Sequence, residues 1–245
     1  MKPNPQPFPF ADYIRTRQTL ERALKDGADR YLLLTGDSGS GKTALVAELL
    51  ASVDRHRLRP LYFSHARQLG PSGLIRVLAR TLRVAPGRSH AETMHALTAQ
   101  VREEPVDLWL SFDEAHDLPP ETLGEVRALA EADLGRESRL HLLFVGLPPL
   151  REHLQAIPPL WRRLTVREEI TSLTRDELPP FLAHHFGKPT AERFHDDALR
   201  LLFERGRGTP GLLGPAARTV LRTAPPKGAI LAPFVEHVLD RWELA

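Results

Sequence analysis

One short segment of the chain has the residue types and spacing of a phosphate-binding loop. It reads Gly36-Asp37-Ser38-Gly39-Ser40-Gly41-Lys42-Thr43. Its glycines let the backbone wrap around a phosphate with N–H groups pointing inward, and a helix that starts at the loop adds the positive end of its dipole. In such a loop we expect Lys42 to reach the β- and γ-phosphates of a nucleotide and Thr43 to place its hydroxyl on Mg²⁺. The alternative is a glycine-rich turn that binds nothing.

The segments that flank this loop favour nucleotide binding. The apolar run 31–35 before it is typical of a buried parallel strand, and residues 44–50 after it have the pattern of a helix. Strand, glycine-rich loop, Lys-Thr and helix, in this order, form the context that the motif requires. We therefore expect residues 36–43 to hold the phosphates of a nucleotide.

A pair of acids follows a later apolar run. Residues 108–112 read Leu-Trp-Leu-Ser-Phe and are followed by Asp113 and Glu114. A carboxylate at the C-terminal end of a strand beside a phosphate loop can hold the Mg²⁺ shell, which is the role expected of Asp113. The next carboxylate, Glu114, can act as a general base on the attacking water. Together with the loop, this pair predicts nucleotide hydrolysis; His116 is interpreted as a partly exposed loop histidine.

Strand and helix patterns alternate around these motifs and are expected to position them. Strands are predicted at 31–35, 60–64, 108–112, 140–145 and 164–170. Helices are predicted at 12–25, 44–50, 74–82, 89–101 and 120–132. The alternation predicts an α/β fold, a parallel sheet with helices on both faces.

The pattern changes near Ser172, after which only helices are expected. Thr174-Arg175-Asp176-Glu177 reads as a capping box, and helices are predicted at 176–185, 196–204, 212–221 and 231–242. We therefore predict three parts: an N-terminal arm and helix over 1–28, a nucleotide-binding α/β domain over 29–171, and a small all-helical C-terminal lid domain over 172–245.

Composition excludes several classes of protein. With 245 residues, 42% hydrophobic and 26% charged, the chain has the make-up of a soluble globular protein. It contains no cysteine, which excludes disulfides, thiolate metal sites and a cysteine nucleophile. No apolar run approaches the ~20 residues that span a bilayer, and the proline-rich N-terminus lacks the apolar core of a signal peptide. We expect a cytoplasmic protein with no membrane partner.

Charge is unevenly distributed along the chain, although the net charge is only +2. Residues 55–102 contain nine arginines and a single acid, Glu92, for a balance of +8. Residues 103–137 contain eleven acids and two arginines. The basic block indicates a polyanion partner. The alternative, given equal weight, is a solvated arginine-rich face paired with the acidic block.

Several of these segments together resemble the AAA+ ATPases of the ExeA, TniB, TnsC and MuB type. The resemblance rests on the phosphate loop, Phe112-Asp113-Glu114-Ala115-His116, Leu142–Val145 with Gly146-Leu147-Pro148, Arg162-Arg163-Leu164-Thr165-Val166 and the C-terminal helices, and it covers about residues 10–220. It implies a P-loop AAA+ fold with a helical lid, and ATP and Mg²⁺ as cofactors. It also implies homo-oligomeric rings or filaments formed when ATP binds.

In this family an arginine of one subunit touches the γ-phosphate held by its neighbour. Arg163, or failing that Arg162, matches the position of this arginine finger. A fixed cationic fork suits the charge that develops on the transferred phosphate. The alternative is that both arginines pair with Glu168 or Glu169.

Two positions depart from the family pattern. A polar residue usually follows the glycine at the end of the fourth strand, whereas Leu147 stands there and offers no side-chain hydrogen bond. The lid often carries Gly-x-Pro-Arg with an arginine on the nucleotide, whereas Gly211 occupies that position. Arg207 and Arg218 are the available replacements. These losses predict slow turnover, which suits a switch better than a motor.

The resemblance favours a regulator of DNA transposition over two alternatives. Such proteins assemble on duplex DNA when bound to ATP and recruit or stimulate a transposase. Arginines would contact the phosphates in a salt-sensitive, sequence-independent manner, and the candidates are Arg67, Arg76, Arg80 and Arg83. The first alternative is a secretion-associated ATPase of the ExeA type. The second is an ATP-driven switch for assembly with a protein partner, without DNA.

Overall fold

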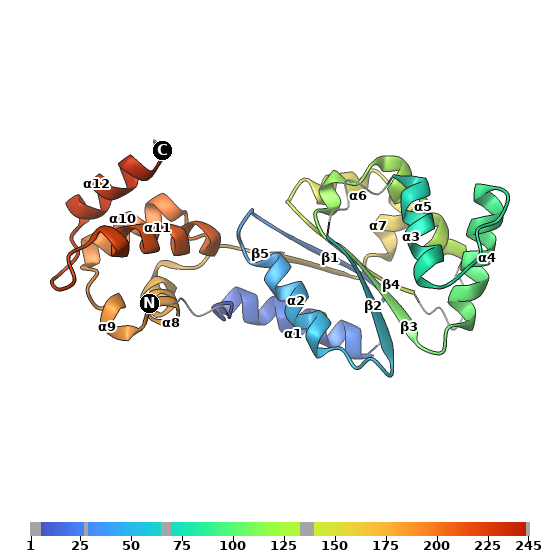
Figure 1. Cartoon of the computed structure of the whole chain (residues 1–245), viewed down its shortest axis with the longest axis horizontal. Helices are drawn as coiled ribbons and strands as arrows, with labels where there is room; N and C mark the ends of the chain where they lie inside the picture. The colour runs from blue at the N-terminus through green and yellow to red at the C-terminus, as the bar shows by residue number, and fades with distance from the viewer. Residues whose placement is uncertain (1–5, 27–28, 65–69, 133–139, 244–245) are drawn as a thin grey trace. The chain divides into compact units, whose positions relative to one another are not determined.

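The structure is a computed structural model and describes residues 6–26, 29–64, 70–132 and 140–243. The chain divides into two compact units. The sheet unit comprises residues 19–35 and 46–169, and the helical unit comprises residues up to Gln18, residues 36–45 and residues from Ile170 onward. Figure 1 shows the elements of both units. Each unit is described separately below.

The sheet unit contains a five-stranded sheet, as the sequence predicts. Its order is β2-β3-β4-β1-β5, and the pairs β2–β3, β3–β4 and β4–β1 are parallel. The strands are β1 (Tyr31–Gly36), β2 (Leu58–Phe63), β3 (Asp107–Phe112), β4 (Leu140–Gly146) and β5 (Val166–Ile170). All five correspond to predicted strands. The fold class predicted from the sequence, a parallel sheet flanked by helices with a helical C-terminal region, is therefore confirmed.

Continuous apolar runs form the three central strands because both faces of these strands are covered. β4 is buried along its whole length, and β1 and β3 are buried apart from their first residues. β2 lies at the edge of the sheet, where Pro60 costs no ladder hydrogen bond that a central strand would need. The most apolar strands therefore lie at the centre of the sheet, and the less apolar β2 lies at its edge.

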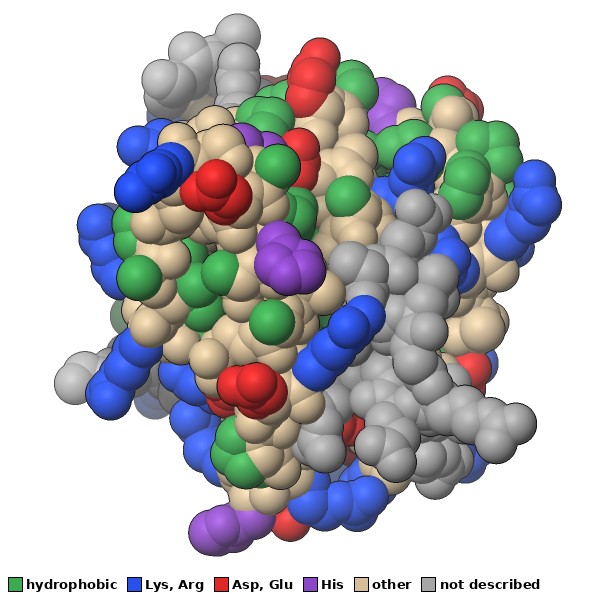
Figure 2. Space-filling view, turned by 90° about the vertical axis from the view of Figure 1, so that its right-hand side faces the viewer, with side chains coloured by type: hydrophobic (Ala, Val, Ile, Leu, Met, Phe, Trp, Pro, Cys, Tyr) green, Lys and Arg blue, Asp and Glu red, His purple; other side chains and the backbone are tan. Residues whose placement is uncertain are grey.

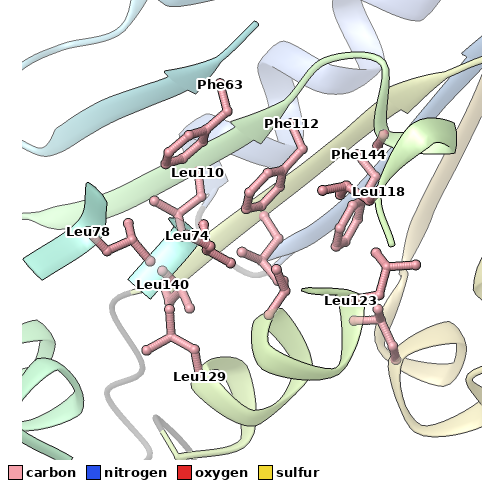
Figure 3. Close-up of a cluster of buried hydrophobic side chains, with 14 of the residues drawn as sticks. Phe63, Leu74, Leu78, Leu110, Phe112, Leu118, Leu123, Leu129, Leu140 and Phe144 are labelled. Atoms are coloured by element: carbon pink, nitrogen blue, oxygen red, sulfur yellow. The ribbon is translucent and has the colours of Figure 1, made fainter. Parts of the chain in front are cut away.

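One face of the sheet packs against helices through a cluster of aromatic and aliphatic side chains. Phe63, Phe112 and Phe144 come from three adjacent strands, and their rings stack with centroids 5.0 and 5.6 Å apart. Leucines of α3 and α5 cover these rings (Figure 3). The helices of this part of the chain are α3 (Pro71–Thr81), α4 (His90–Glu103), α5 (Pro120–Ala132), α6 (Leu150–Gln155) and α7 (Pro158–Arg163). The core therefore fixes the ends of β2, β3 and β4.

The helical unit contains the phosphate loop, the N-terminal residues and the C-terminal helices. These helices are α8 (Leu178–Phe186), α9 (Lys188–Ala191), α10 (Asp196–Gly206), α11 (Pro210–Thr223) and α12 (Ala232–Glu243), after the 3-10 turn η3 (Arg175–Glu177). The predicted capping box is present, with Thr174 and Glu177 each accepting the other's backbone N–H. α11 begins two residues before the predicted start because proline is favoured in the first turn of a helix.

Two helices connect elements that belong to different units, α1 (Ala11–Asp26) and α2 (Lys42–Ser52). The start of α1 is fixed within the helical unit. The Ala11 N–H donates to Glu177 Oε1 at 2.8 Å, and Asp12 Oδ2 accepts from the Thr171 N–H and hydroxyl at 2.7 and 2.9 Å. The domain limits expected at residues 28 and 171 remain predictions. Among the described residues, no helix has both the length and the hydrophobicity needed to cross a bilayer.

Candidate nucleotide-binding site

The phosphate loop follows β1, precedes α2 and belongs to the helical unit, and it has the backbone that the motif requires. Gly39 and Gly41 have φ of 79° and 103°, a left-handed conformation that favours glycine. Lys42 is the first residue of α2 and is buried. Its Nζ donates to the carbonyl oxygens of Gly36 and Asp37 at 2.8 and 2.7 Å. The loop therefore wraps around the side chain of Lys42, and its own carbonyl oxygens bind the ammonium group. The phosphate oxygens of a bound nucleotide would compete with these two carbonyls for the ammonium.

A cavity of about 300 Å³ adjoins the loop within the same unit. Its walls come from the loop and α2, the N-terminal arm, α8 and α11, including Ser40, Gly41, Ala44, Phe8, Phe10, Phe181, Phe186, Gly214 and Arg218. A volume of this size is at the lower end of those that hold small ligands. The aromatic and small side chains of this lining suit a ligand with a flat base, and the adjoining glycine-rich loop suits an anionic group on that ligand.

One buried polar atom supports the fit of an anionic ligand to this cavity. Ser40 is 2% exposed, and its hydroxyl has no hydrogen-bond partner among the residues that the structure describes. Leaving a buried hydroxyl unsatisfied costs about 1–3 kcal/mol. A phosphate oxygen would satisfy it. The residues present therefore fit the nucleotide that the sequence predicts.

The start of α11 approaches the phosphate loop through backbone atoms. The Gly211 N–H donates to the Gly39 carbonyl at 2.9 Å. A Cβ atom at Gly211 would lie 2.7 Å from Gly39 Cα, a distance at which backbone atoms would have to move. Any side chain at this position would therefore require the two backbones to move apart. Of the two possible replacements, Arg218 lines the cavity, and Arg207 ends α10 in a left-handed conformation.

The predicted metal ligand and general base lie at the end of β3 in the sheet unit. Asp113 is 4% exposed, and its N–H donates to the Phe63 carbonyl at 2.9 Å. Its Oδ1 accepts the Glu114 N–H at 3.0 Å. Glu114 has φ of 53°, a conformation that is uncommon for a residue with a side chain. A sharp change of backbone direction after the strand therefore separates the two carboxylates.

Tyr62 is a site residue that sequence reasoning missed. Its hydroxyl donates to Asp113 Oδ2 at 2.6 Å from the neighbouring strand β2. Burial, together with the hydrogen bond to the Asp113 carboxylate, raises the pKa of Tyr62 well above its usual value. The only sequence signal is a polar aromatic residue near the end of a predicted strand. Strand order, which places β2 beside β3, is needed to see the contact.

His116 is partly exposed, as the sequence predicts, but it is not an isolated loop residue. It lies in the 3-10 turn η2 (Ala115–Asp117). Its Nδ1 lies 3.3 Å from the Leu147 nitrogen and 3.4 Å from Glu114 Oε2. Its Nε2 lies 4.0 Å from Asp117 Oδ1. The ring therefore stands between the predicted base and the end of β4.

The two candidate finger residues lie at the end of α7. Arg162 is exposed, and Arg163 is half-buried with Nη1 3.5 Å from the Pro159 carbonyl oxygen. A role on a neighbouring subunit needs a second copy of the chain. It stays a prediction.

Arg76 and Arg80, two of the four candidate DNA-binding residues, line one cavity in the sheet unit. The cavity has a volume of about 740 Å³ and lies between α3 and the start of α4. Its walls also include Arg88 and His90, which sequence reasoning did not propose for this role. Arg83 follows α3 in a left-handed conformation, with φ of 57°. Arg67 lies outside the described residues.

Part of the basic block is paired with acids. Arg59 contacts Glu104 at 3.4 Å, and His90 contacts Glu125 at 3.1 Å. Figure 2 shows the side of the molecule on which α4 lies, where lysine and arginine side chains are spread out with acidic and histidine side chains between them. Arg76, Arg80 and Arg88 line the same α3–α4 cavity.

The sheet order, the phosphate loop and the helical C-terminal region define a P-loop protein of the AAA+ ATPase class. A family profile described as "AAA domain" matches residues 25–154, just over half of the chain. The chain belongs to this family. No curated protein matches it.

Three of the solved structures that share this fold show the extent of the likeness. Cdc6p of Pyrobaculum aerophilum is 21% identical with a TM-score of 0.66, over 88% of this chain and 62% of that one. The Aeropyrum pernix ORC1 protein in complex with DNA is 17% identical with a TM-score of 0.62, over 95% and 64%. RuvB of Thermotoga maritima is 18% identical with a TM-score of 0.57, over 93% and 67%. The chain spans less than two thirds of the first two, and the likeness establishes the fold.

Proposed function

We propose that this protein hydrolyses ATP slowly with Mg²⁺ and uses the ATP-bound state to bind duplex DNA and regulate a transposase. The observation that carries the nucleotide part is the phosphate loop with its buried, unsatisfied Ser40 hydroxyl and adjoining cavity. Residues 29–171 would form the nucleotide-binding domain and residues 172–245 the lid. Oligomers would form through ATP binding, with Arg163 or Arg162 reaching the neighbouring subunit's nucleotide.

Each residue of the site has a role in the proposed hydrolysis. Residues 36–41 present backbone N–H groups to the phosphates, and Lys42 gives up its carbonyl contacts for the β- and γ-phosphates. Thr43 and Asp113 would hold Mg²⁺, which neutralises phosphate charge when bound. Glu114 takes a proton from water as the water oxygen bonds to the γ-phosphorus and the bond to the bridging oxygen breaks, giving ADP and phosphate.

Phosphate release by the wild type, Lys42→Ala and Glu114→Gln tests this proposal. Removal of a general base lowers turnover by about 10²–10⁴-fold, so Glu114→Gln should bind ATP and release almost no phosphate. Lys42→Ala should lose ATP binding. An inactive wild type with Mg²⁺ and ATP, or equal turnover by the wild type and Glu114→Gln, would contradict the proposal.

DNA binding is supported by the α3–α4 cavity and by the nature of the similar structures. Three arginines line the cavity, and no Asp or Glu is among the residues described as lining it. One similar structure is described as ORC1 in complex with DNA and another as a Holliday junction branch migration motor. The link to a transposase is supported by the resemblance of the motifs to TniB, TnsC and MuB. Arg67 and Arg83 complete the proposed DNA-binding set.

A second function, an ATP-driven switch for a protein partner, is favoured by one contact. The Gly211–Gly39 hydrogen bond couples the lid directly to the phosphate loop, so that nucleotide binding would change the lid's attachment. Recruitment of a purified transposase by Arg76→Glu/Arg80→Glu separates the two functions. If recruitment is unchanged and DNA binding is lost, the arginines bind DNA and are not needed for recruitment, which supports the DNA function. Full DNA binding by this variant would contradict the assignment of DNA binding to these arginines, and absence of DNA binding by the wild type would leave the switch as the better account.

A further inference from the structure

The ring of His116 occupies a space that exists because residue 146 is glycine. A Cβ atom on Gly146 would lie 3.0 Å from His116 Nδ1 and 3.2 Å from the His116 backbone nitrogen. Contacts this short require the histidine to move. The glycine at the end of β4 therefore allows the imidazole to reach the backbone of the next residue, Leu147.

Nδ1 of His116 faces two groups with opposite hydrogen-bonding character. Leu147 presents an N–H at 3.3 Å, and Glu114 presents a carboxylate oxygen at 3.4 Å. One ring nitrogen either accepts through its lone pair or donates its proton. As an acceptor it fixes the end of β4, and as a donor it holds the Glu114 carboxylate. It cannot serve both groups at once.

The other nitrogen of the ring has a separate neighbour. Nε2 lies 4.0 Å from Asp117 Oδ1, beyond direct hydrogen-bond distance but close enough for one intervening water. Nδ1 is therefore the atom through which the ring contacts both the base and the strand. A substituent that retains a polar group at the Nδ1 position should retain the function, and one that retains only the Nε2 position should not.

We propose that His116 is the positioning residue that couples Glu114 to the end of β4. This proposal rests on the proposed ATPase function. When Nδ1 accepts the Leu147 N–H, Glu114 is released to orient water. When Nδ1 donates to Glu114, the base is withheld. Through these two contacts, the hydrogen bonding of the Leu147 N–H at the end of β4 determines whether His116 holds the predicted base, Glu114.

Two substitutions of His116 test the role of Nδ1 specifically. Asparagine places a polar atom near the Nδ1 position, whereas glutamine places one near the Nε2 position. We expect His116→Asn to keep kcat within a few-fold of wild type. We expect His116→Gln and His116→Ala to lower kcat by up to about 10²-fold, the effect of a misplaced catalytic group, with KM for ATP unchanged. His153→Asn, at an exposed histidine of α6, is the matched control. Equal activity of all variants, or a change in KM alone, would overturn the proposal.

A measurement without nucleotide separates this proposal from the ATPase proposal. In ¹⁵N-labelled wild-type protein, a scalar coupling between the Leu147 amide nitrogen and His116 Nδ1 is expected across the hydrogen bond. A protonated Nδ1 with no such coupling, and no contact to Glu114, would overturn the coupling role even if ATP is hydrolysed. A detected coupling in a protein without turnover would show that the ATPase proposal fails while the His116 contact stands.

Discussion

Replacing Gly211 with alanine would place a methyl group against the phosphate loop. The added Cβ would lie 2.7 Å from Gly39 Cα and 3.0 Å from the Gly39 carbonyl oxygen, whereas carbon atoms in ordinary contact are about 3.5–4.0 Å apart. Both neighbours are backbone atoms, so α11 or the loop must move by several tenths of an ångström. Overpacking of this kind costs about 1–3 kcal/mol, and stretching the Gly211–Gly39 hydrogen bond adds about 1 kcal/mol.

Helix propensity acts in the opposite direction. Alanine is favoured over glycine in a helix by about 1 kcal/mol, which leaves Gly211→Ala destabilised by about 1–3 kcal/mol. For a protein of this size, each kcal/mol lowers Tm by about 2–4 °C. Thermal unfolding followed by far-ultraviolet circular dichroism would measure the shift.

Gly214→Ala is the matched control for this substitution. It lies in the same helix, but its Cβ would meet only the Phe181 ring, at an ordinary distance of 3.8 Å. The same propensity gain then applies without a clash, so this variant should be as stable as wild type or slightly more stable. Equal Tm values for Gly211→Ala and Gly214→Ala would refute the close approach of α11 to the loop.

Three further predictions concern other contacts. Tyr62→Phe removes the hydroxyl that donates to Asp113 and should lower the free energy of unfolding by about 1 kcal/mol; the loss is modest because the tyrosine is partly exposed to water. Urea titration measures this change, and an unchanged midpoint would contradict it. Burial raises the pKa of Asp12, but its hydrogen bonds to Thr171 and Arg15 outweigh this and lower the pKa overall, so its stabilisation is present above pH 3.8 and lost as pH falls through the folded pKa; as pH is lowered from 3.8, stability should therefore fall less steeply in Asp12→Asn than in the wild type, and identical slopes would refute this. Arg76→Glu/Arg80→Glu should weaken DNA binding and reduce its salt dependence by about one phosphate contact per residue, and binding equal to that of an Arg22→Glu control would contradict the assigned surface.

The strands and long helices follow from local sequence patterns. Continuous apolar runs predict β1, β3 and β4 because these strands are buried on both faces. α6 and α7 were not predicted, because a segment of six residues is too short to show the helical period and so cannot be distinguished from a turn. β2 begins before Pro60 because the edge of a sheet tolerates proline.

The site was only partly predictable, for a different reason. The phosphate loop is one contiguous segment and the strand-end acids are another, so residue types and spacing are sufficient to propose each of them. The contacts of Tyr62 with Asp113, His116 with Leu147 and Gly211 with Gly39 join residues that are distant in sequence. They depend on strand order and backbone approach, which no local pattern contains. Arg88 was missed as a lining residue because the shape of the α3–α4 cavity depends on how the two helices pack in the tertiary structure.

Duplex-DNA binding by the purified wild-type protein with ATP, with ADP and without nucleotide, across a salt series, tests the central claim most directly. We predict binding that requires ATP and weakens steeply with salt, because arginines displace counterions from the phosphates. Filaments or rings on the DNA in electron micrographs would accompany it. Absence of binding in every nucleotide state at low salt would contradict the account.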